Sequence, residues 1–380
     1  MKILQISPFY PPHIGGIEKH VWELSNKLAN AGHKVTVYTS NVPKSKKYEI
    51  NNEVQIYRFK SFCSLLNNHF VPGYLFKLIN ATTFDVIHMH GSLHFSSNIT
   101  AFSKIFKKSP IVLTTHGAKV NYQDWKRIIE TLYNKTIGKW TLKSADRIIT
   151  PSLKEVNLLE RLGVDRDKII VIPNWIDLNK ISLNLNAEEF KNLYQLHDKK
   201  IILFVSGLIP RKGINNLIDA MKYVKSDSIL LIVGGELPGH PGVKRLLEEQ
   251  VKKLGLKNIL FLGRVSKEHL ECAYIVADVF VLPSLAEGLP LVLLEAMGYR
   301  KCVVATDIPG NSDVIQNNKT GILFKSGNSM ELAEKINYLL ANERLRKEIG
   351  DAARKEVEKN YNFDAAFDKI VAVYKMVAKK

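Results

Sequence analysis

The 380-residue sequence has no uninterrupted apolar stretch that approaches the ~20 residues a membrane-spanning helix needs. The short apolar run at the N-terminus, MKILQIS, is broken by Gln5 and Ser7 and is followed by prolines, so we expect no signal peptide. Low-complexity tracts and internal repeats are also absent, which excludes fibrous and solenoid classes. We therefore expect a globular cytoplasmic protein that is either soluble or peripheral at the cytoplasmic face of the membrane.

Cysteine is scarce. Cys63, Cys272 and Cys302 lie far apart in the sequence, each among apolar residues. This spacing excludes a disulfide framework and a cysteine-ligated zinc site. We expect three buried free thiols and no bound metal.

Acidic residues are few relative to basic ones. The chain has 37 Asp and Glu against 54 Lys and Arg, for a net charge of +17. Before residue 174 basic residues outnumber acidic ones by roughly two to one. This half favours an anionic partner, and nucleic acid, an anionic membrane surface and a phosphorylated substrate all fit. A solvated basic surface with no specific partner fits equally well.

Apolar runs alternate with helical patterns along the whole chain. The first series is MKILQIS, HKVTVYTS, VQIYRF, DVIHMHG, PIVLTTHG and RIITPS, and the second is IILFVSG, SILLIVGG, NILFLG, VFVLPS, CVVAT and GILF. This alternation predicts two α/β units, each with a parallel sheet covered by helices on both faces. The segment 174–199 joins them, and residues 362–380 predict an amphipathic terminal helix.

Ligands of such sheets lie at the carboxyl ends of the strands, so residues that directly follow strands are candidates. Gly15 and Gly16 precede a helix whose N–H groups can receive a phosphate, although a tight turn without a ligand explains them as well. His116 and His90 end two strands, where an imidazole can bind a sugar hydroxyl or carry a proton. An ordinary position at the core edge is the better interpretation of His90.

Arg211 and Lys212 follow the first strand of the second unit, in SGLIPRKG. A guanidinium beside an ammonium suits a diphosphate, and a solvated basic turn is the alternative. The pattern Asp165-x-Asp167 resembles a metal–nucleotide site, but it precedes a strand and so lies at the wrong edge of the sheet.

Two carboxylates frame the stretch LPSLAEGLPLVLLEAMG. Pro290 suits the first turn of a helix, which puts Glu287 in the loop before it and Glu295 about two turns inside it. An ideal helical rise separates the two acids by roughly 12 Å, too far for the paired carboxylates of a glycoside hydrolase. Each acid is expected to accept hydrogen bonds from a different part of one extended ligand.

Together these motifs, with GGIEKHV, THG, VIPN, RKG and VVAT, resemble the retaining glycosyltransferases of family four over essentially the whole chain. The resemblance implies the GT-B architecture of two facing Rossmann-like domains. It places an acceptor-binding domain at 1–177 and a donor-binding domain at 178–361, with the terminal helix 362–380 crossing back to the first domain.

The resemblance also implies a reaction: metal-independent transfer, with retention, of a hexose-type sugar from a nucleotide-sugar donor to a glycan or lipid-linked saccharide acceptor, with no cofactor. Glu287 would contact hydroxyls of the donor sugar and Glu295 the ribose, while Arg211 and Lys212 neutralise the diphosphate. His116 would lie beside the donor sugar. The implied catalytic residues are His116, Arg211, Lys212 and Glu287, and the implied donor-binding residues are Gly15, Gly16, Gly288, Leu289, Pro290, Leu291 and Glu295.

Three places depart from the family pattern. Arg300, Lys301 and Cys302 stand where Gly-x-Pro is common, Trp175 follows Asn174 in place of glycine, and Gly310 alone remains of a usual pair of glycines. The shapes of the hinge and of the sugar pocket depend on these positions.

The segments FSKIFKKSP and DWKRIIETLYNKTIGKWTLK combine cations with Trp125 and Trp140, as interfacial helices do, and favour peripheral contact with an anionic membrane. Packing of both tryptophans in the first core is the alternative. A nucleotide-sugar epimerase or phosphorylase, and a polyanion-binding protein, are the other functions considered. No aromatic and basic nucleic-acid module is recognisable, so we expect no nucleic acid.

Overall fold

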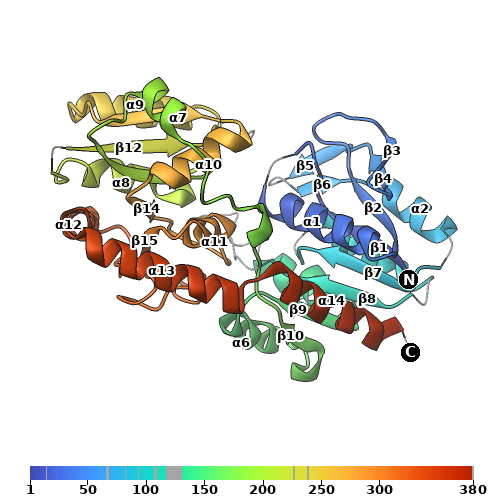
Figure 1. Cartoon of the computed structure of the whole chain (residues 1–380). Helices are drawn as coiled ribbons and strands as arrows, with labels where there is room; N and C mark the ends of the chain where they lie inside the picture. The colour runs from blue at the N-terminus through green and yellow to red at the C-terminus, as the bar shows by residue number, and fades with distance from the viewer. Residues whose placement is uncertain are drawn as a thin grey trace. The chain divides into compact units, whose positions relative to one another are not determined.

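The computed structural model describes residues 1–13, 15–65, 68–81, 83–92, 94–106, 109–116, 131–225, 227–237 and 239–378. The chain forms two compact units (Figure 1). Unit 1 comprises Met1–Asn174 and Ala365–Lys380, and unit 2 comprises Trp175–Asp364. The sequence led us to expect these boundaries at 177 and 361. Each unit has its own sheet and core.

The central sheet of unit 1 has eight strands in the order β10-β9-β8-β7-β1-β2-β4-β3. Its strands are parallel except β3, which pairs antiparallel with β4 at one edge. A separate antiparallel hairpin consists of β5 and β6. The strands are β1 (Lys2–Ile6), β2 (Lys34–Ser40), β3 (Tyr48–Asn51), β4 (Val54–Phe59), β5 (Cys63–Leu65), β6 (Asn68–Phe70), β7 (Val86–His90), β8 (Ile111–Thr114), β9 (Arg147–Thr150) and β10 (Ile169–Val171).

The terminal helix belongs to unit 1, as the family resemblance implied. Its residues Phe367, Ile370, Val373, Tyr374 and Val377 are buried and recur at the spacing of one helical face. The hydroxyl of Tyr374 hydrogen-bonds Gln5 of β1 and His88 of β7, and these bonds hold the helix against the sheet. The helices of unit 1 are α1 (Gly16–Asn30), α2 (Gly73–Asn80), α3 (Phe95–Ser103), α5 (Lys139–Ser144), α6 (Leu153–Arg161) and α14 (Phe363–Ala378).

Unit 2 contains a six-stranded, fully parallel sheet in the order β13-β12-β11-β14-β15-β16. Its strands are β11 (Lys200–Val205), β12 (Ser228–Val233), β13 (Ile259–Gly263), β14 (Val279–Leu282), β15 (Cys302–Thr306) and β16 (Ile322–Phe324). The helices are α7 (Glu188–Tyr194), α8 (Ile214–Ala220), α9 (Val243–Lys253), α10 (Lys267–Val276), α11 (Leu291–Gly298), α12 (Ser329–Ala341) and α13 (Glu343–Asn360).

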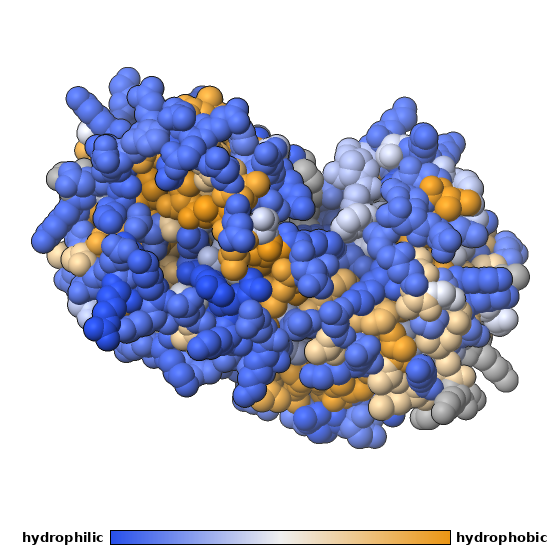
Figure 2. All heavy atoms as spheres, in the orientation of Figure 1, coloured by the Kyte–Doolittle hydropathy of each residue, from blue (hydrophilic) through white to orange (hydrophobic). Residues whose placement is uncertain are grey.

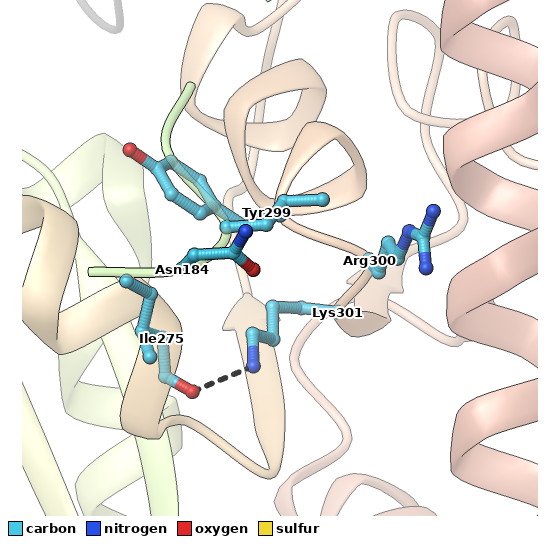
Figure 3. A pocket seen from close by; sticks show the side chains of 6 residues that line it. Asn184, Ile275, Tyr299, Arg300 and Lys301 are labelled. Atoms are coloured by element: carbon cyan, nitrogen blue, oxygen red, sulfur yellow. Dashed lines mark hydrogen bonds between the residues drawn. The ribbon is translucent and has the colours of Figure 1, made fainter. Parts of the chain in front are cut away.

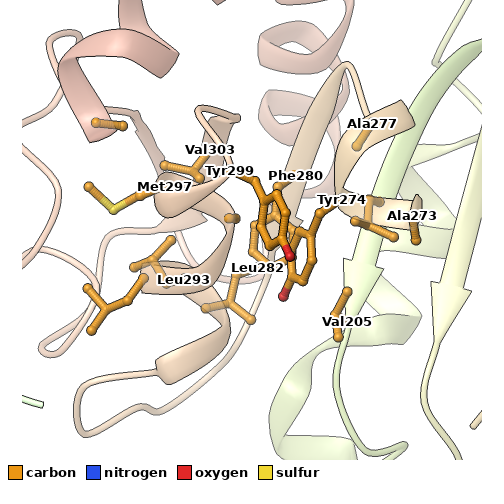
Figure 4. Packing of buried hydrophobic residues seen from close by; sticks show 14 of the residues in the cluster. Val205, Ala273, Tyr274, Ala277, Phe280, Leu282, Leu293, Met297, Tyr299 and Val303 are labelled. Atoms are coloured by element: carbon orange, nitrogen blue, oxygen red, sulfur yellow. The ribbon is translucent and has the colours of Figure 1, made fainter. Parts of the chain in front are cut away.

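Both faces of this second sheet are apolar. Phe280 and Leu282 point to the face covered by α10, α11 and α13 (Figure 4), whereas Val279 and Val281 point to the face covered by α8, α9 and α12. Burial on both faces explains why its strands appear in the sequence as continuous apolar runs rather than as alternating ones. The visible surface is largely hydrophilic, with hydrophobic side chains in scattered groups (Figure 2).

The junction explains the unusual Trp175. Its side chain is buried and stacks on Phe363, with ring centroids 5.2 Å apart and planes 14° from parallel. Next to it, the N–H of Ile176 donates to the carbonyl of Tyr361 at 2.9 Å. The two segments that leave unit 2 are therefore paired with each other, and Trp175 fills space that a glycine would leave empty.

Some expectations about unit 1 were wrong. Cys63 is exposed, because it lies in the small β5–β6 hairpin rather than in a buried strand. The other two cysteines, Cys272 and Cys302 of unit 2, are buried as expected. The antiparallel edge strand β3 and this hairpin were not predicted, since three- and four-residue strands carry too little periodicity to be recognised.

Gly350 tests the packing of α13 against the turn before β15. A Cβ at this position would clash with the backbone carbonyl of Arg300. We expect Gly350→Ala to lower the free energy of unfolding by about 1–3 kcal/mol, measured by thermal or urea unfolding. The control is Lys347→Ala on the exposed side of the same helix, with an expected change below about 0.5 kcal/mol. Equal melting of both variants would contradict this packing.

Candidate active site

The candidate site of unit 2 lies where two loops meet at the carboxyl edge of the sheet. Strands β11 and β14 are hydrogen-bonded neighbours, so the loops that follow them adjoin. The backbone N–H of Leu285 in the second loop donates to the carbonyl of Arg211 in the first at 2.8 Å. Gly213, with a φ of 66°, permits this approach, because a Cβ there would clash with the carbonyl oxygen of Pro283.

The two loops bring Glu287 together with both predicted cations. Lys212 Nζ lies 2.6 Å from Glu287 Oε1, and Arg211 Nη1 lies 3.4 Å from Glu287 Oε2. Ser284 Oγ donates to Glu287 Oε1 at 2.6 Å. The side chains of Glu287 and Lys212 are only 6% and 13% exposed, so this is a buried ion pair.

Burial and charge act in opposite directions on this pair. Burial alone would raise the pKa of Glu287, but the charges of Lys212 and Arg211 outweigh it and hold that pKa below the ordinary value. Burial lowers the pKa of Lys212, and the neighbouring carboxylate opposes that shift only in part. At neutral pH Glu287 is therefore an ionised carboxylate stabilised by the two cations.

The loop that follows β15 stabilises the loop of Glu287 through hydrogen bonds. Thr306 Oγ1 donates to the carbonyl of Ser284 at 2.6 Å, and Asn311 Nδ2 donates to the carbonyl of Thr306 at 3.0 Å. Gly310, with a φ of 90°, lies so close to the loop that a Cβ would clash with the carbonyl of Gly288. Sequence reasoning missed Ser284, Thr306 and Asn311, although the first two stand at strand ends, where candidates were sought.

Helix α11 begins at Leu291, and Pro290 caps it in an extended conformation rather than forming its first turn. Glu295 is the fifth residue of this helix, so it lies about one turn inside the helix and not two. Tyr274 Oη donates to Glu295 Oε2 at 3.0 Å and stacks on Tyr299, with ring centroids 4.9 Å apart (Figure 4). Gly288, Leu289, Pro290 and Leu291 form the connection between the two acids, as expected from the sequence.

Unit 1 holds the other predicted residues. His116 has a φ of 60° and a partly exposed side chain, and its Nε2 lies 2.9 Å from Nδ1 of His90. Gly15 caps α1 and Gly16 begins it. The carboxylate of Glu18 lies against Gly15 and pairs with His13 at 3.0 Å, so an internal acid already occupies this helix start. Gly117 of the THG motif lies outside the described residues.

Three histidines of unit 1, His20, His90 and His116, have ring nitrogens within 4.8 Å of one another; they are the one such group of potential metal ligands in the described part of the chain. Two nitrogens that bind the same tetrahedral zinc at about 2.0–2.1 Å stand roughly 3.3 Å apart. The 2.9 Å between His90 and His116 is instead the length of a hydrogen bond. That hydrogen bond joins His90 and His116, while the ring of His20 packs edge-on against that of His116, with centroids 4.5 Å apart.

The departure at Arg300 and Lys301 forms a separate pocket of about 500 Å³ at the end of α11. Lys301 Nζ points to α10 and donates to the carbonyl of Ile275 at 2.8 Å, and Arg300 points away from it (Figure 3). Burial lowers the pKa of Lys301 to about 8. Neither cation contacts the loop of Glu287.

Comparison with known proteins places this architecture in a family. The family model of glycosyl transferases group 1 matches residues 186–356, and that of Glycosyltransferase Family 4 matches residues 14–180. An uncharacterized glycosyltransferase of Methanocaldococcus jannaschii is 31% identical over 96% of this chain and 95% of its own length. The chain belongs to glycosyltransferase family 4.

Other relatives of this glycosyltransferase agree. A phosphatidyl-myo-inositol mannosyltransferase of Mycobacterium leprae is 27% identical over 100% of this chain and 97% of its own. Among solved structures, the sucrose-phosphate synthase of Thermosynechococcus elongatus superimposes with a TM-score of 0.84 at 22% identity, covering 99% of each chain. Anabaena HepE, solved in complex with UDP-glucose, superimposes with a TM-score of 0.83 at 19% identity over 99% of this chain and 100% of its own. These likenesses confirm the predicted GT-B fold.

The buried pair of this glycosyltransferase can be tested without any ligand. Lys212→Met leaves Glu287 buried with only the more distant Arg211 beside it, so we expect the free energy of unfolding to fall by roughly 3 kcal/mol at neutral pH. Adding Glu287→Gln in the same chain should restore most of the loss. Because the pKa of Glu287 is lowered, the stability from its charge is present at neutral pH and is lost as the pH falls below the ordinary value of 4.5.

Urea unfolding of the single and double variants measures this coupling. The control is Lys244→Met, which breaks the exposed pair with Glu248 and should cost less than about 0.5 kcal/mol. Losses that simply add in the double variant would show that the two side chains are not coupled.

Proposed function

We propose that this glycosyltransferase transfers a hexose-type sugar, with retention and without a metal, from a nucleotide-diphosphate sugar to a glycan or lipid-linked saccharide. One observation carries the proposal: two cations and an ionised acid converge at the carboxyl edge of the unit 2 sheet, directly before the N-terminus of α11. Cations and free helical N–H groups suit a diphosphate, whereas a carboxylate suits the hydroxyls of a sugar.

Arg211 and Lys212 are assigned to the diphosphate. In the absence of donor, both cations pair with the carboxylate of Glu287. When the donor binds, its phosphate oxygens pair with the two cations in part, and the Glu287 carboxylate accepts hydrogen bonds from the sugar hydroxyls. Glu295, held by Tyr274, lies on the far side of the Gly288–Leu291 connection, where the ribose would be bound. The related fold of Anabaena HepE, solved with UDP-glucose, supports a donor of this kind.

Departure of the nucleotide builds negative charge on the diphosphate and positive character on the anomeric carbon. Cations already fixed by buried contacts stabilise the first without reorganising. Lys212 meets this condition, since Glu287 and its own burial hold it in place. Such cations do the work of a divalent metal ion, which is the basis for proposing metal independence. Retention rests on the family resemblance.

The residues of unit 1 complete the assignment. His116 would contact the donor sugar, because its partly exposed imidazole ends the β8 segment at the carboxyl edge of that sheet. Gly15 and Gly16 would approach the phosphates at the start of α1. Glu18, which now pairs with His13 there, would have to give way to a bound phosphate.

Contact with an anionic membrane is proposed for unit 1. None of the helices in the described ranges is long and apolar enough to cross a bilayer. At the end of α3, Phe102, Ile105 and Phe106 are 41%, 67% and 57% exposed, in a segment rich in lysine. Trp140 is 42% exposed, so it does not simply fill the core, whereas Trp125 lies outside the described residues. Exposed aromatics beside cations suit the interface of an anionic bilayer.

A donor screen tests the reaction. We expect one nucleotide-diphosphate sugar among UDP, GDP and ADP conjugates to raise the melting temperature selectively, because it binds only the folded protein. Transfer from that donor should continue in EDTA and yield a product with the anomeric configuration of the donor, read by NMR. Arg211→Ala should weaken donor binding tenfold or more, by about 1.5 kcal/mol. Loss of activity in EDTA that magnesium restores would refute metal independence.

Vesicle sedimentation tests the membrane contact. The protein should bind vesicles with phosphatidylserine and not purely zwitterionic ones, and Ile105→Asp with Phe106→Asp should abolish binding without changing transfer to a soluble acceptor. Tyr338→Asp, at an exposed apolar position of unit 2, is the matched control. Binding that survives the double change would place the contact elsewhere.

A further inference from the structure

Six side chains of unit 1 form a continuous chain of hydrogen bonds that ends at the partly exposed His116. His116 Nε2 lies 2.9 Å from His90 Nδ1, and His90 Nε2 lies 2.7 Å from Gln5 Oε1. Gln5 Nε2 lies 3.1 Å from Tyr374 Oη, which in turn lies 2.7 Å from His88 Nδ1. His88 Nε2 ends the chain on Thr114 Oγ1 at 2.7 Å. These groups come from β1, β7, β8, the segment just after β8, and the terminal helix α14.

The amide of Gln5 sets the direction of the whole chain. Its NH₂ group can only donate, so Tyr374 Oη accepts from it and has its own proton left to donate to His88 Nδ1. Its carbonyl oxygen can only accept, so His90 carries its proton on Nε2 and has an unprotonated Nδ1. His116 must then donate from Nε2 to His90. A neutral His116 bound in this way has an unprotonated Nδ1.

The histidines are neutral, as this direction requires. Burial, reinforced by the neighbouring imidazoles, lowers the pKa of His88 and of His116 to about 3, and it lowers that of His90 well below the ordinary value. Burial also lowers the pKa of His20, whose ring centroid is 4.5 Å from that of His116. At neutral pH each ring therefore holds one proton, and its position depends on the hydrogen-bond partners alone.

We infer that the Gln5 amide, held by the hydroxyl of Tyr374 on the last helix as a positioning residue, fixes His116 as the Nε2–H tautomer, with Nδ1 as a hydrogen-bond acceptor. Among the described residues nothing pairs with that Nδ1, and His116 is partly exposed. This rests on the proposed function, under which His116 contacts the donor sugar: Nδ1 then accepts a hydrogen bond from a sugar hydroxyl. Rotation of the Gln5 amide would reverse every donor and acceptor and protonate Nδ1 instead.

The tautomers can be read directly, without any substrate. In ¹⁵N-histidine-labelled protein, two-bond ¹⁵N–¹H spectra at neutral pH distinguish protonated from unprotonated ring nitrogens, and His116→Asn assigns the signals. We expect His88, His90 and His116 all to carry the proton on Nε2. A proton on Nδ1 of His116 in the native protein would overturn the inference, whatever the enzyme's activity.

Tyr374→Phe tests the role of the hydroxyl. We expect a mixture of His116 tautomers, and a fall in kcat/KM for the donor of roughly tenfold to a hundredfold, the range seen when the outer partner of a metal-bound histidine is removed. The Kd of the nucleotide diphosphate without its sugar should not change, because none of its proposed contacts is a member of this hydrogen-bonded chain. A merely structural defect would weaken both.

The matched control is Tyr74→Phe, which removes another fully buried hydroxyl of unit 1, 3.4 Å from the carbonyl of Ser7 and outside the chain. It should leave the tautomers and the donor kinetics unchanged, and melting curves should show both variants folded. If Tyr374→Phe keeps the native tautomers, Tyr374 has no positioning role. If no donor is turned over at all, the proposed function fails while the tautomer result still decides the inference.

Discussion

A carboxylate withdrawn from water must have cations beside it, and the candidate site of this glycosyltransferase is organised around that requirement. Glu287 obtains its cations from a loop 75 residues earlier, which reaches it because β11 and β14 are neighbours in a parallel sheet. The close approach depends on Gly213 and Gly310, where no side chain fits. Burial holds the Lys212 side chain in place, and the carboxylate of Glu287 favours its charged form, at the position proposed for the diphosphate of a donor.

Unit 1 meets a comparable requirement with neutral groups. Gln5 and His88 lie wholly inside the sheet, where an unsatisfied amide or imidazole would be costly, and the hydroxyl of Tyr374 on α14 satisfies both. The terminal helix is thus held to unit 1 by polar contacts as well as by its apolar face. Because hydrogen bonds in a buried chain depend on one another, the orientation of the Gln5 amide determines which nitrogen of the partly exposed His116 ring carries the proton.

Prediction from the sequence succeeded where the signal was local and failed where it depended on distant neighbours. The alternation of strands and helices, and the loops holding Arg211, Lys212 and Glu287, followed from short patterns. The start of α11 was misplaced because a proline suits both a helix cap and a first turn. Trp175 looked anomalous until Phe363 was found against it. Ser284 and Asn311 were missed, since only the folded chain shows which polar side chains support the loop of Glu287.

The sequence by itself determined which segments form strands and helices, which of them are buried on both faces, and which charged residues stand in loops at the carboxyl edge. These properties depend on residues within a few positions of one another. Tertiary structure alone decided the strand order β13-β12-β11-β14, the partners of Glu287 and the direction of the hydrogen bonds that reach His116. Each of these depends on contacts between segments far apart in the chain, and such contacts exist only once the sheets have assembled.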